Sequence, residues 1–268
     1  MKALRFLHIP KTAGSTLSFI LNRLYKNEIF FSFTGDATLD DQRFSALSEY
    51  EKNNIGVFIG HAPVVTGIRQ ADDATIVTFL RDPVDRVRSF CQHVSEGKSQ
   101  YLLEKYPPDK FCLDEFLESG IMELSNYQTT MLVNQRNKVS PISINKMSEM
   151  EAREAALENL LDKISCFGLQ EYFDESLIML SSTLNWKMPL YESKNKKNIN
   201  NLIQFEKSHL ERIEDLNRID IEVYRLAKEI FVCAIESEEF DRNKLKRFQL
   251  LNKLAGNIGV SIMDKIIR

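Results

Sequence analysis

A short segment near the start of the chain carries residue types that bind anions. Lys11 begins a loop of small residues, and the hydroxyls of Ser15 and Thr16 follow where a helical pattern opens. A lysine beside the backbone N–H groups of a helix start is a favourable environment for a phosphate or sulfate group. The loop is not a Walker A motif, because Lys11 precedes Gly14 instead of following it. The segment therefore predicts an anion cradle, with an ordinary strand-to-helix turn as the alternative.

A second candidate, Arg81, follows the apolar run Ala74 to Leu80. Asp82 is a favourable N-cap and Pro83 a favourable first helical residue, so a strand, a turn and a helix are predicted. The planar guanidinium of arginine can meet a phosphate through two hydrogen bonds. A salt bridge with a nearby acid such as Asp85 is an equally good interpretation of Arg81 from chemistry alone.

A histidine, His61, follows the short apolar run Val57 to Ile59. A neutral imidazole near its ordinary pKa can take a proton from a hydroxyl group, which makes His61 a candidate general base. A single histidine after a strand is more often structural, so the pattern alone leaves both roles open. His8, within the first loop, is expected to support the loop.

The apolar runs indicate the elements that hold these residues. Ala3 to His8 precedes the first loop, and Cys166 to Leu169 is a further candidate strand. Uninterrupted apolar runs that alternate with helical patterns are typical of parallel strands buried on both faces of a sheet. Ligands of such sheets bind where strands end and helices begin, so Lys11, His61 and Arg81 are expected to gather at one edge.

The rest of the chain is predicted to be mainly helical. Ser148 and Glu151 form a capping-box pair, residues 174–184 fit a helix, and residues 205–231 show one long periodic pattern. The fold class that follows is α/β, with a central parallel sheet flanked by helices. Trp186 is expected in the core.

Length and composition indicate one large domain with an appendage. The 268 residues are 43% hydrophobic, enough for one sizeable core. We predict an α/β domain over residues 1–240 and an amphipathic, basic helical tail over residues 241–268. The tail is expected to pack on the domain or on a partner subunit, which allows a homo-oligomer; binding to a membrane surface is the alternative.

Charge and cysteine content argue against several classes of protein. The formal net charge of −3 gives no global field for nucleic acid or an anionic membrane. No signal-peptide pattern opens the sequence and no apolar stretch is long enough to span a membrane, so a soluble, cytoplasmic protein is predicted. The widely spaced cysteines predict reduced, buried thiols and no zinc site or disulfide framework. They are Cys91, Cys112, Cys166 and Cys233.

Three segments resemble one enzyme family. His-Ile-Pro-Lys-Thr-Ala-Gly-Ser-Thr at residues 8–16 resembles the phosphosulfate-binding loop of the carbohydrate sulfotransferase superfamily, which includes the heparan sulfate 2-O- and 6-O-sulfotransferases. Residues 79–90 resemble its strand, turn and helix that hold the 3′-phosphate, through Arg81 and Ser89. Residues 58–63 resemble the Gly-His segment that carries the catalytic base of the 2-O enzyme. The resemblance implies a P-loop-like, three-layer α/β fold.

The same resemblance implies a donor, a set of ligands and a mechanism. The donor is 3′-phosphoadenosine 5′-phosphosulfate (PAPS), and the acceptor is a hydroxyl group of a glycan, a glycolipid or a small molecule. In-line displacement at sulfur uses His61 as base, while Lys11 neutralises charge on the departing PAP; no metal is required. The implied donor-binding residues are Lys11, Thr12, Ala13, Gly14, Ser15, Thr16, Arg81, Ser89, Lys194, Lys196 and Lys197.

Other segments have weaker assignments. Residues 125–132 resemble a helix of the 6-O enzymes that could contact donor or acceptor, although a polar helix face is equally expected. The loop at residues 194–198 is expected either to close over the 3′-phosphate and adenine or to be a solvated loop. Arg86 and Arg88 are expected on a solvated face or paired with acids. His93 and His209 fall on helical patterns and receive no role.

Two other classes of function remain open at this point. A nucleotide kinase shares the parallel sheet and an anion loop, and it predicts binding of ATP with magnesium. A non-catalytic module that binds a nucleotide or a glycan predicts binding without a role for His61 in turnover.

Overall fold

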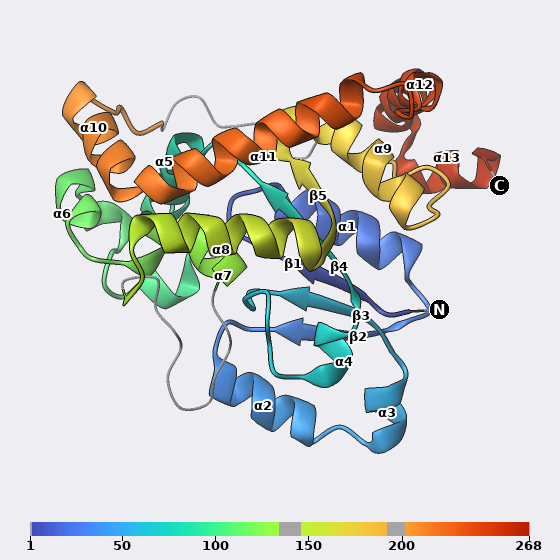
Figure 1. Ribbon diagram of the computed structural model, residues 1–268, viewed down its shortest axis with the longest axis horizontal. Coiled ribbons are helices and arrows are strands. Elements are labelled where there is room, and N and C mark those ends of the chain that lie inside the picture. Colours follow the sequence, from blue (N-terminus) through green and yellow to red (C-terminus); the bar gives the residue numbers. More distant parts are fainter. Residues whose placement is uncertain (1, 134–145, 192–201, 268) are drawn as a thin grey trace.

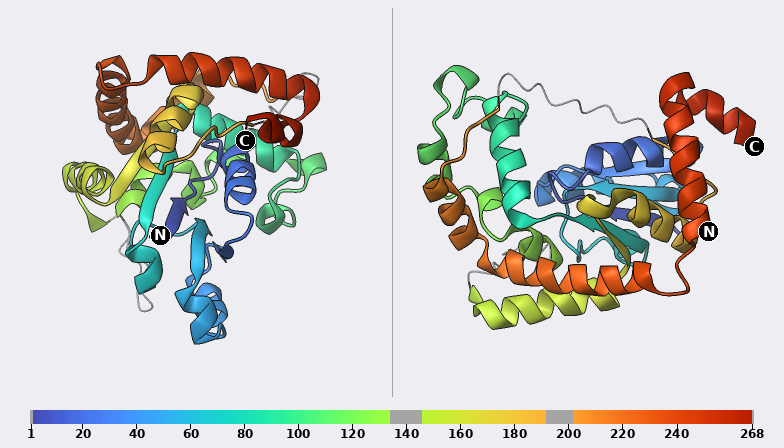
Figure 2. Two further views of the ribbon diagram at one scale, coloured as in Figure 1. Left: turned by 90° about the vertical axis from the view of Figure 1, so that its right-hand side faces the viewer. Right: turned by 90° about the horizontal axis from the view of Figure 1, so that it is seen from above.

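A computed structural model of the chain describes residues 2–133, 146–191 and 202–267 (Figure 1). Its centre is a five-stranded sheet with the strand order β2-β3-β1-β4-β5, in which all neighbouring strands are parallel. The strands are β1 (Leu4–Leu7), β2 (Ile29–Phe33), β3 (Ile55–Gly60), β4 (Thr75–Leu80) and β5 (Ile164–Leu169). Helices cover both faces, so the prediction of a three-layer α/β fold is confirmed (Figure 2).

Sequence patterns predict four of these strands and miss β2. Phe31 and Phe33 of β2 are buried while Ser32 between them is exposed, as expected for an alternating strand at the edge of the sheet. At the centre of the sheet, Leu7 of β1 pairs with Gly60 of β3 and with Thr78 of β4. The carboxyl ends of β1, β3 and β4 therefore lie at the same end of the sheet.

One face of the sheet is covered by four helices. They are α1 (Gly14–Leu24), α9 (Phe173–Thr183), α12 (Arg242–Ile258) and α13 (Val260–Ile267). Phe248 and Ala255 of α12 are fully buried in the same apolar cluster as Phe6 and Leu17. The predicted tail thus packs on the sheet domain; the boundary at residue 240 and self-association through the tail stay predictions. Trp186 is buried in this cluster, as expected.

The other face is covered by α7 (Tyr127–Val133), α8 (Glu149–Asp162) and α11 (Arg218–Glu236). Ser148 and Glu151 form the predicted capping box at the start of α8. The periodic pattern over residues 205–231 corresponds to two helices, α10 (Lys207–Leu216) and α11, which are separated at Asn217. The Asn217 amide donates to the carbonyl oxygens of Leu124 and Ile213 at 2.8 and 2.9 Å, which holds the chain at this break.

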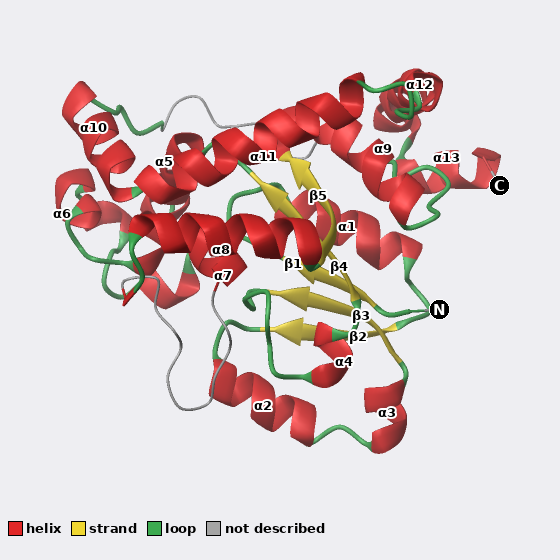
Figure 3. Ribbon diagram, in the orientation of Figure 1, coloured by secondary structure: helices red, strands yellow, loops and turns green. Residues whose placement is uncertain are grey.

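The remaining helices lie beside the sheet. α2 (Ala37–Ser45), α3 (Glu49–Asn53) and α4 (Arg69–Asp72) lie on the side of β2 and β3, while α5 (Pro83–Ser95), α6 (Leu113–Leu117) and α10 lie at the end toward which the strands point (Figure 3). Asp82 caps α5 by accepting from the N–H of Asp85 at 3.0 Å, and Pro83 is its first residue, as predicted.

The four cysteines are free thiols. Cys91 and Cys166 are buried as predicted, but the expectation of buried thiols is wrong for Cys112, which is half-buried, and Cys233, which is exposed on α11. Within residues 2–133, 146–191 and 202–267, no helix combines the length and apolar character needed to cross a membrane.

Candidate functional site

The loop between β1 and α1 turns through two unusual backbone conformations. Lys11 and Ala13 have φ angles of 70° and 69°, in the left-handed region that few residues other than glycine adopt. No side chain caps α1 at Ala13; the Thr16 N–H donates to the Ala13 carbonyl oxygen at 3.1 Å, which leaves the N–H groups of Gly14 and Ser15 as the available donors at the helix start. The backbone thus offers donors beside Lys11, which is the arrangement of an anion cradle.

Two contacts hold the shape of this loop. The Thr12 hydroxyl donates to the carbonyl oxygen of Ile9 at 2.8 Å, and Thr12 is fully buried. Gly14 lies directly against the ring of His8, because a Cβ atom on Gly14 would come within 1.7 Å of His8 Nε2. Thr12 and Gly14 therefore shape the loop, while Ser15 is exposed and its hydroxyl is accessible.

The loop and the turn after β4 are joined directly. Arg81 Nη1 donates to the carbonyl oxygen of Lys11 at 3.1 Å, across 70 residues of sequence. The alternative interpretation of Arg81, a salt bridge to Asp85, is not formed: Asp85 pairs with Arg88 at 3.0 Å. The expected pairing of Arg88 with an acid is confirmed.

Lys11 and Arg81 form a pair of like charges in a partly buried place. Burial, the Arg81 charge and the Lys98 charge lower the pKa of Lys11 to about 8. Burial also lowers the pKa of Arg81, and the nearby carboxylates of Asp85, Glu171 and Asp82 oppose this shift. A lysine whose charge is disfavoured by burial and by a neighbouring arginine makes a site that a bound anion would stabilise.

His61 contacts the same loop. Its Nδ1 lies 2.9 Å from the carbonyl oxygen of His8, and the two imidazole rings lie with centroids 4.6 Å apart. A carbonyl oxygen only accepts, so this contact requires the proton on Nδ1 and leaves Nε2 of a neutral His61 as the basic nitrogen. Among the described residues Nε2 has no hydrogen-bond partner. His61 is thereby held in the tautomer that a general base needs.

His8 is neutral at ordinary pH. Burial, with the charges of His61 and Lys11, lowers its pKa to about 3. The His8 ring is stacked on Phe6 with centroids 5.3 Å apart, and the main-chain N–H of His8 donates to the carbonyl oxygen of Gly60 at 3.1 Å. These contacts agree with its expected role in supporting the loop.

The helix that follows Arg81 adds a residue that sequence reasoning missed. Ser89 and His93 lie one helical turn apart on α5, and both are half-buried. Burial lowers the pKa of His93 to about 4, with contributions from the charges of Lys11 and Lys98. His93 therefore lies near Lys11. Its spacing of four residues from Ser89 is the only signal for this in the sequence.

Arg86 is not on a solvated face. It is fully buried, it donates from Nη2 to the carbonyl oxygen of Glu123 at 2.6 Å, and its guanidinium carbon lies 5.8 Å from the centre of the Tyr127 ring. The prediction of a solvated Arg86 is therefore wrong. Burial lowers the pKa of Arg86, and the charge of the Asp220 carboxylate is the largest effect that opposes this shift.

The weaker assignments have separate outcomes. Residues 125–132 include the first six residues of α7, and the polar helix face expected there is wrong, because Gln128 and Thr129 are buried. Gln128 hydrogen-bonds the main chain of Arg81. Lys194, Lys196 and Lys197 lie outside the described residues, so their contact with a donor stays a prediction.

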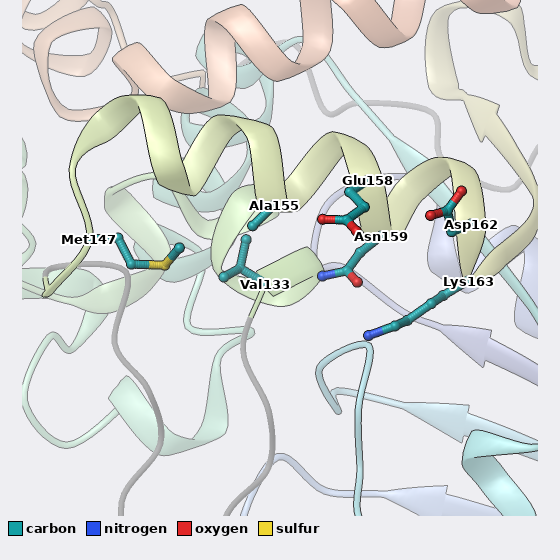
Figure 4. Close-up of a pocket in the computed structure, with 7 residues that line it drawn as sticks. All are labelled: Val133, Met147, Ala155, Glu158, Asn159, Asp162 and Lys163. Atoms are coloured by element: carbon teal, nitrogen blue, oxygen red, sulfur yellow. The ribbon is translucent and has the colours of Figure 1, made fainter.

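Two surface pockets lie away from this site. One, of about 340 Å³, is lined by α8 and by Val133 and Met147, with Asn159, Asp162 and Lys163 at its other end (Figure 4). The other lies near Tyr25 and Trp186, at the opposite ends of the strands. Neither contains a residue predicted for the site. In the part of the chain that the structure describes, no three His, Cys, Asp or Glu side chains cluster as metal ligands do.

Comparisons with known proteins agree with this geometry. The model of the sulfotransferase family matches residues 2–227. Heparan-sulfate 6-O-sulfotransferase 3 of Homo sapiens is 28% identical over 177 residues, which cover 58% of this chain and 37% of that protein. Heparan-sulfate 6-O-sulfotransferase 2 of Danio rerio is 26% identical over 208 residues, covering 68% and 44%. The Gallus gallus heparan-sulfate 6-O-sulfotransferase 2 is 24% identical over 186 residues, covering 62% and 46%.

These relatives correct the predicted location. Heparan-sulfate 6-O-sulfotransferases are enzymes of the Golgi lumen, so the cytoplasmic prediction is wrong. It depended on the absence of a leader pattern in the first residues. The chain spans less than half the length of the relatives described above, so the location of the protein cannot be inferred from its first residues.

The family match covers most of the chain, including His61 and both turns predicted to bind anions. On this match, and with its parallel sheet and paired cationic turns, the chain belongs to the sulfotransferase family.

Proposed function

We propose that this chain transfers a sulfuryl group from PAPS to a hydroxyl group of a carbohydrate. The observation that carries the proposal is the hydrogen bond from Arg81 Nη1 to the Lys11 carbonyl oxygen, at 3.1 Å. It joins the turn that resembles a phosphosulfate loop to the turn that resembles a 3′-phosphate site. An adenosine nucleotide with an anion at each end suits two neighbouring cationic turns.

The local chemistry of the two turns fits such a donor. The left-handed conformations of Lys11 and Ala13 leave the start of α1 available as a source of N–H donors. The charge of Arg81 disfavours the charged form of Lys11 in the free protein, and an anion would relieve this. The hydroxyl of Thr12 is used to hold the loop, so Thr12 would contact PAPS through its main-chain N–H.

The residues divide the work of an in-line transfer. Arg81 and Ser89 hold the 3′-phosphate, while Lys11, Ser15, Thr16 and the N–H groups of α1 hold the phosphosulfate. Lys11 compensates the negative charge that PAP gains as it leaves. His61 Nε2 takes the proton of the acceptor hydroxyl, since Nδ1 is committed to the His8 carbonyl oxygen.

The acceptor class is proposed from the relatives. The curated proteins described above carry heparan sulfate in their names, and heparan sulfate is a polymeric carbohydrate. A carbohydrate hydroxyl is therefore the first acceptor to test.

A transfer assay with labelled PAPS tests the proposal. Desulfated heparan sulfate, other glycans and small alcohols serve as acceptors, and ATP with magnesium serves as a control donor of phosphate. We expect transfer of label to a glycan, with turnover reduced about 100-fold or more in His61→Ala and in Lys11→Ala. His209→Ala, on α10, is the matched control and is expected to keep its activity. Phosphate transfer from ATP, or equal turnover in His61→Ala, would contradict the proposal.

A further inference from the structure

The main chain of Arg81 is held from both sides by one side chain. The Arg81 N–H donates to Gln128 Oε1 at 3.0 Å, and Gln128 Nε2 donates to the Arg81 carbonyl oxygen at 2.8 Å. Gln128 is 2% exposed. Its amide thus pairs with both backbone groups of one residue, as a neighbouring strand would, and both of those groups belong to the turn where β4 has ended.

Gln128 is itself fixed by a carboxylate from a distant part of the chain. The N–H groups of Gln128 and Thr129 donate to Asp220 Oδ2 and Oδ1 at 3.0 and 2.7 Å, and the Thr129 hydroxyl donates to Oδ1 at 2.7 Å. Asp220 lies in the first turn of α11 and is 1% exposed. It therefore accepts from the start of α7, where N–H groups have no intrahelical partner.

The contact between α7 and α11 is reciprocal. Asn126, which precedes α7 in a left-handed conformation with φ of 44°, accepts through Oδ1 from the N–H groups of Ile219 and Asp220 at 3.0 and 3.1 Å. Each helix start is thus capped by a side chain of the other segment. The two helices are locked together at the point where Gln128 leaves α7 toward Arg81.

The charge of Arg86 acts on Asp220 inside the fold. Burial raises the pKa of Asp220, and the positive charge of Arg86 and the hydrogen bonds from Thr129 and Gln128 oppose that shift. Three donated hydrogen bonds suit an ionised, acceptor-only carboxylate. The Asp220 carboxylate holds α7 through these three hydrogen bonds, and the charge of Arg86 favours its ionised form against the effect of burial.

The main chain of the next residue, Asp82, is held by Glu171. The Asp82 N–H donates to Glu171 Oε1 at 2.9 Å, and the Tyr224 hydroxyl donates to Glu171 Oε2 at 2.7 Å. Arg81 and Asp82 are consequently held by Gln128 from α7 and by Glu171 after β5. The only hydrogen bond of the Arg81 guanidinium to a described residue is the one to the Lys11 carbonyl oxygen.

We propose that Gln128 is a positioning residue of the donor site, which fixes the Arg81 turn relative to Lys11, and that Asp220 acts behind it. This rests on the proposed function, because the effect that matters is on the 3′-phosphate end of the donor. Among the described residues, the side-chain amide of Gln128 hydrogen-bonds to the main chain of Arg81, so we infer that it acts through geometry and not through contact with a ligand. A guanidinium that is placed in advance loses less freedom when a phosphate binds.

The test compares Gln128→Met with wild-type protein. Methionine has a similar length and removes both hydrogen bonds to Arg81. We expect the dissociation constant for PAP, measured by calorimetry, to rise about tenfold, with KM for PAPS rising alongside and kcat and the acceptor KM changing little. Hydrogen exchange at the Arg81 amide should accelerate at least as much, with or without PAP.

Asn159→Ala is the matched control. Asn159 donates to the carbonyl oxygen of Leu132 at 2.9 Å, at the opposite end of α7, so its loss disturbs the same helix without touching Arg81. If Gln128→Met binds PAP as tightly as Asn159→Ala does, the inference is wrong while the proposed function stands. If wild-type protein binds no PAP, the proposed function fails as well. Should Gln128→Met not fold, Gln128→Glu replaces it, because its second oxygen opposes the Arg81 carbonyl oxygen and should also weaken PAP binding.

Discussion

Arg81 Nη1 lies 3.1 Å from the carbonyl oxygen of Lys11 and donates a hydrogen bond to it. This contact joins the turn after β1 to the turn after β4, and it brings two cationic side chains into one site. The two strands are neighbours in the sheet, so the fold itself sets the spacing between the two proposed ends of the donor.

The activity should fall as the pH rises through about 8. Burial and neighbouring cations lower the pKa of Lys11 to about 8, so this side chain loses its charge above that pH in the free protein. We expect kcat/KM for PAPS to decline with an apparent pKa near this value. In Lys11→Arg the decline should move to higher pH, because a guanidinium keeps its charge. A profile that is unchanged in Lys11→Arg would exclude Lys11 as the titrating group.

The contact between Gly14 and His8 should appear as coupling between two substitutions. Gly14→Ala places a Cβ atom where the His8 ring lies, and we expect it to reduce the free energy of unfolding by about 1–3 kcal/mol. In a His8→Ala background the same substitution should cost much less, since the obstructing ring is gone. Denaturant unfolding of the four proteins measures the coupling. An equal cost in both backgrounds would show that the ring does not set this constraint.

His8 should make stability depend on pH. In the unfolded chain His8 takes up a proton near pH 6.5, whereas in the folded protein its pKa is about 3. The stability conferred by a neutral His8 is therefore present above pH 6.5 and is lost as the pH falls toward 3. Between pH 8 and pH 5 the free energy of unfolding should fall by about 2 kcal/mol more in wild-type protein than in His8→Gln. Parallel curves for the two proteins would contradict the assignment.

The fold was largely predictable because its strands are apolar runs that end in recognisable turns. Asp82 and Pro83 indicate the start of α5, and Ser148 and Glu151 indicate the start of α8. The edge strand β2 was not predicted, although Ile29–Phe33 is apolar apart from Ser32. The break at Asn217 depends on its contact with Leu124, 93 residues away, which periodicity does not reveal.

The site was predictable only where its residues form contiguous motifs. Lys11, His61 and Arg81 each follow a strand, and parallel topology brings such positions to one edge. Gln128 and Asp220 could not be assigned in this way, because their hydrogen bonds join segments 47 and 92 residues apart. Arg86 was misplaced because charged residues are mostly exposed, and its burial depends on partners from other elements.

The C-terminal helices should contribute to stability through Phe248. Its side chain is fully buried against the sheet domain, so Phe248→Ala is expected to reduce the free energy of unfolding by about 3–5 kcal/mol. Leu250→Ala is the control, because Leu250 lies on the outer side of α12 and is 61% exposed; it should change stability by about 0.5 kcal/mol or less. Equal effects of the two substitutions in urea unfolding would contradict the packing of α12 on the sheet.

Calorimetric titration with PAP tests most directly whether the Lys11 and Arg81 turns bind a single adenosine nucleotide. We expect wild-type protein to bind PAP with micromolar affinity and to bind ATP with magnesium far more weakly. Arg81→Ala should lose PAP binding, while Arg88→Ala, which removes an exposed arginine from the helix α5 that follows Arg81, should retain it. Undiminished PAP binding in Arg81→Ala, or a preference for ATP, would contradict the account.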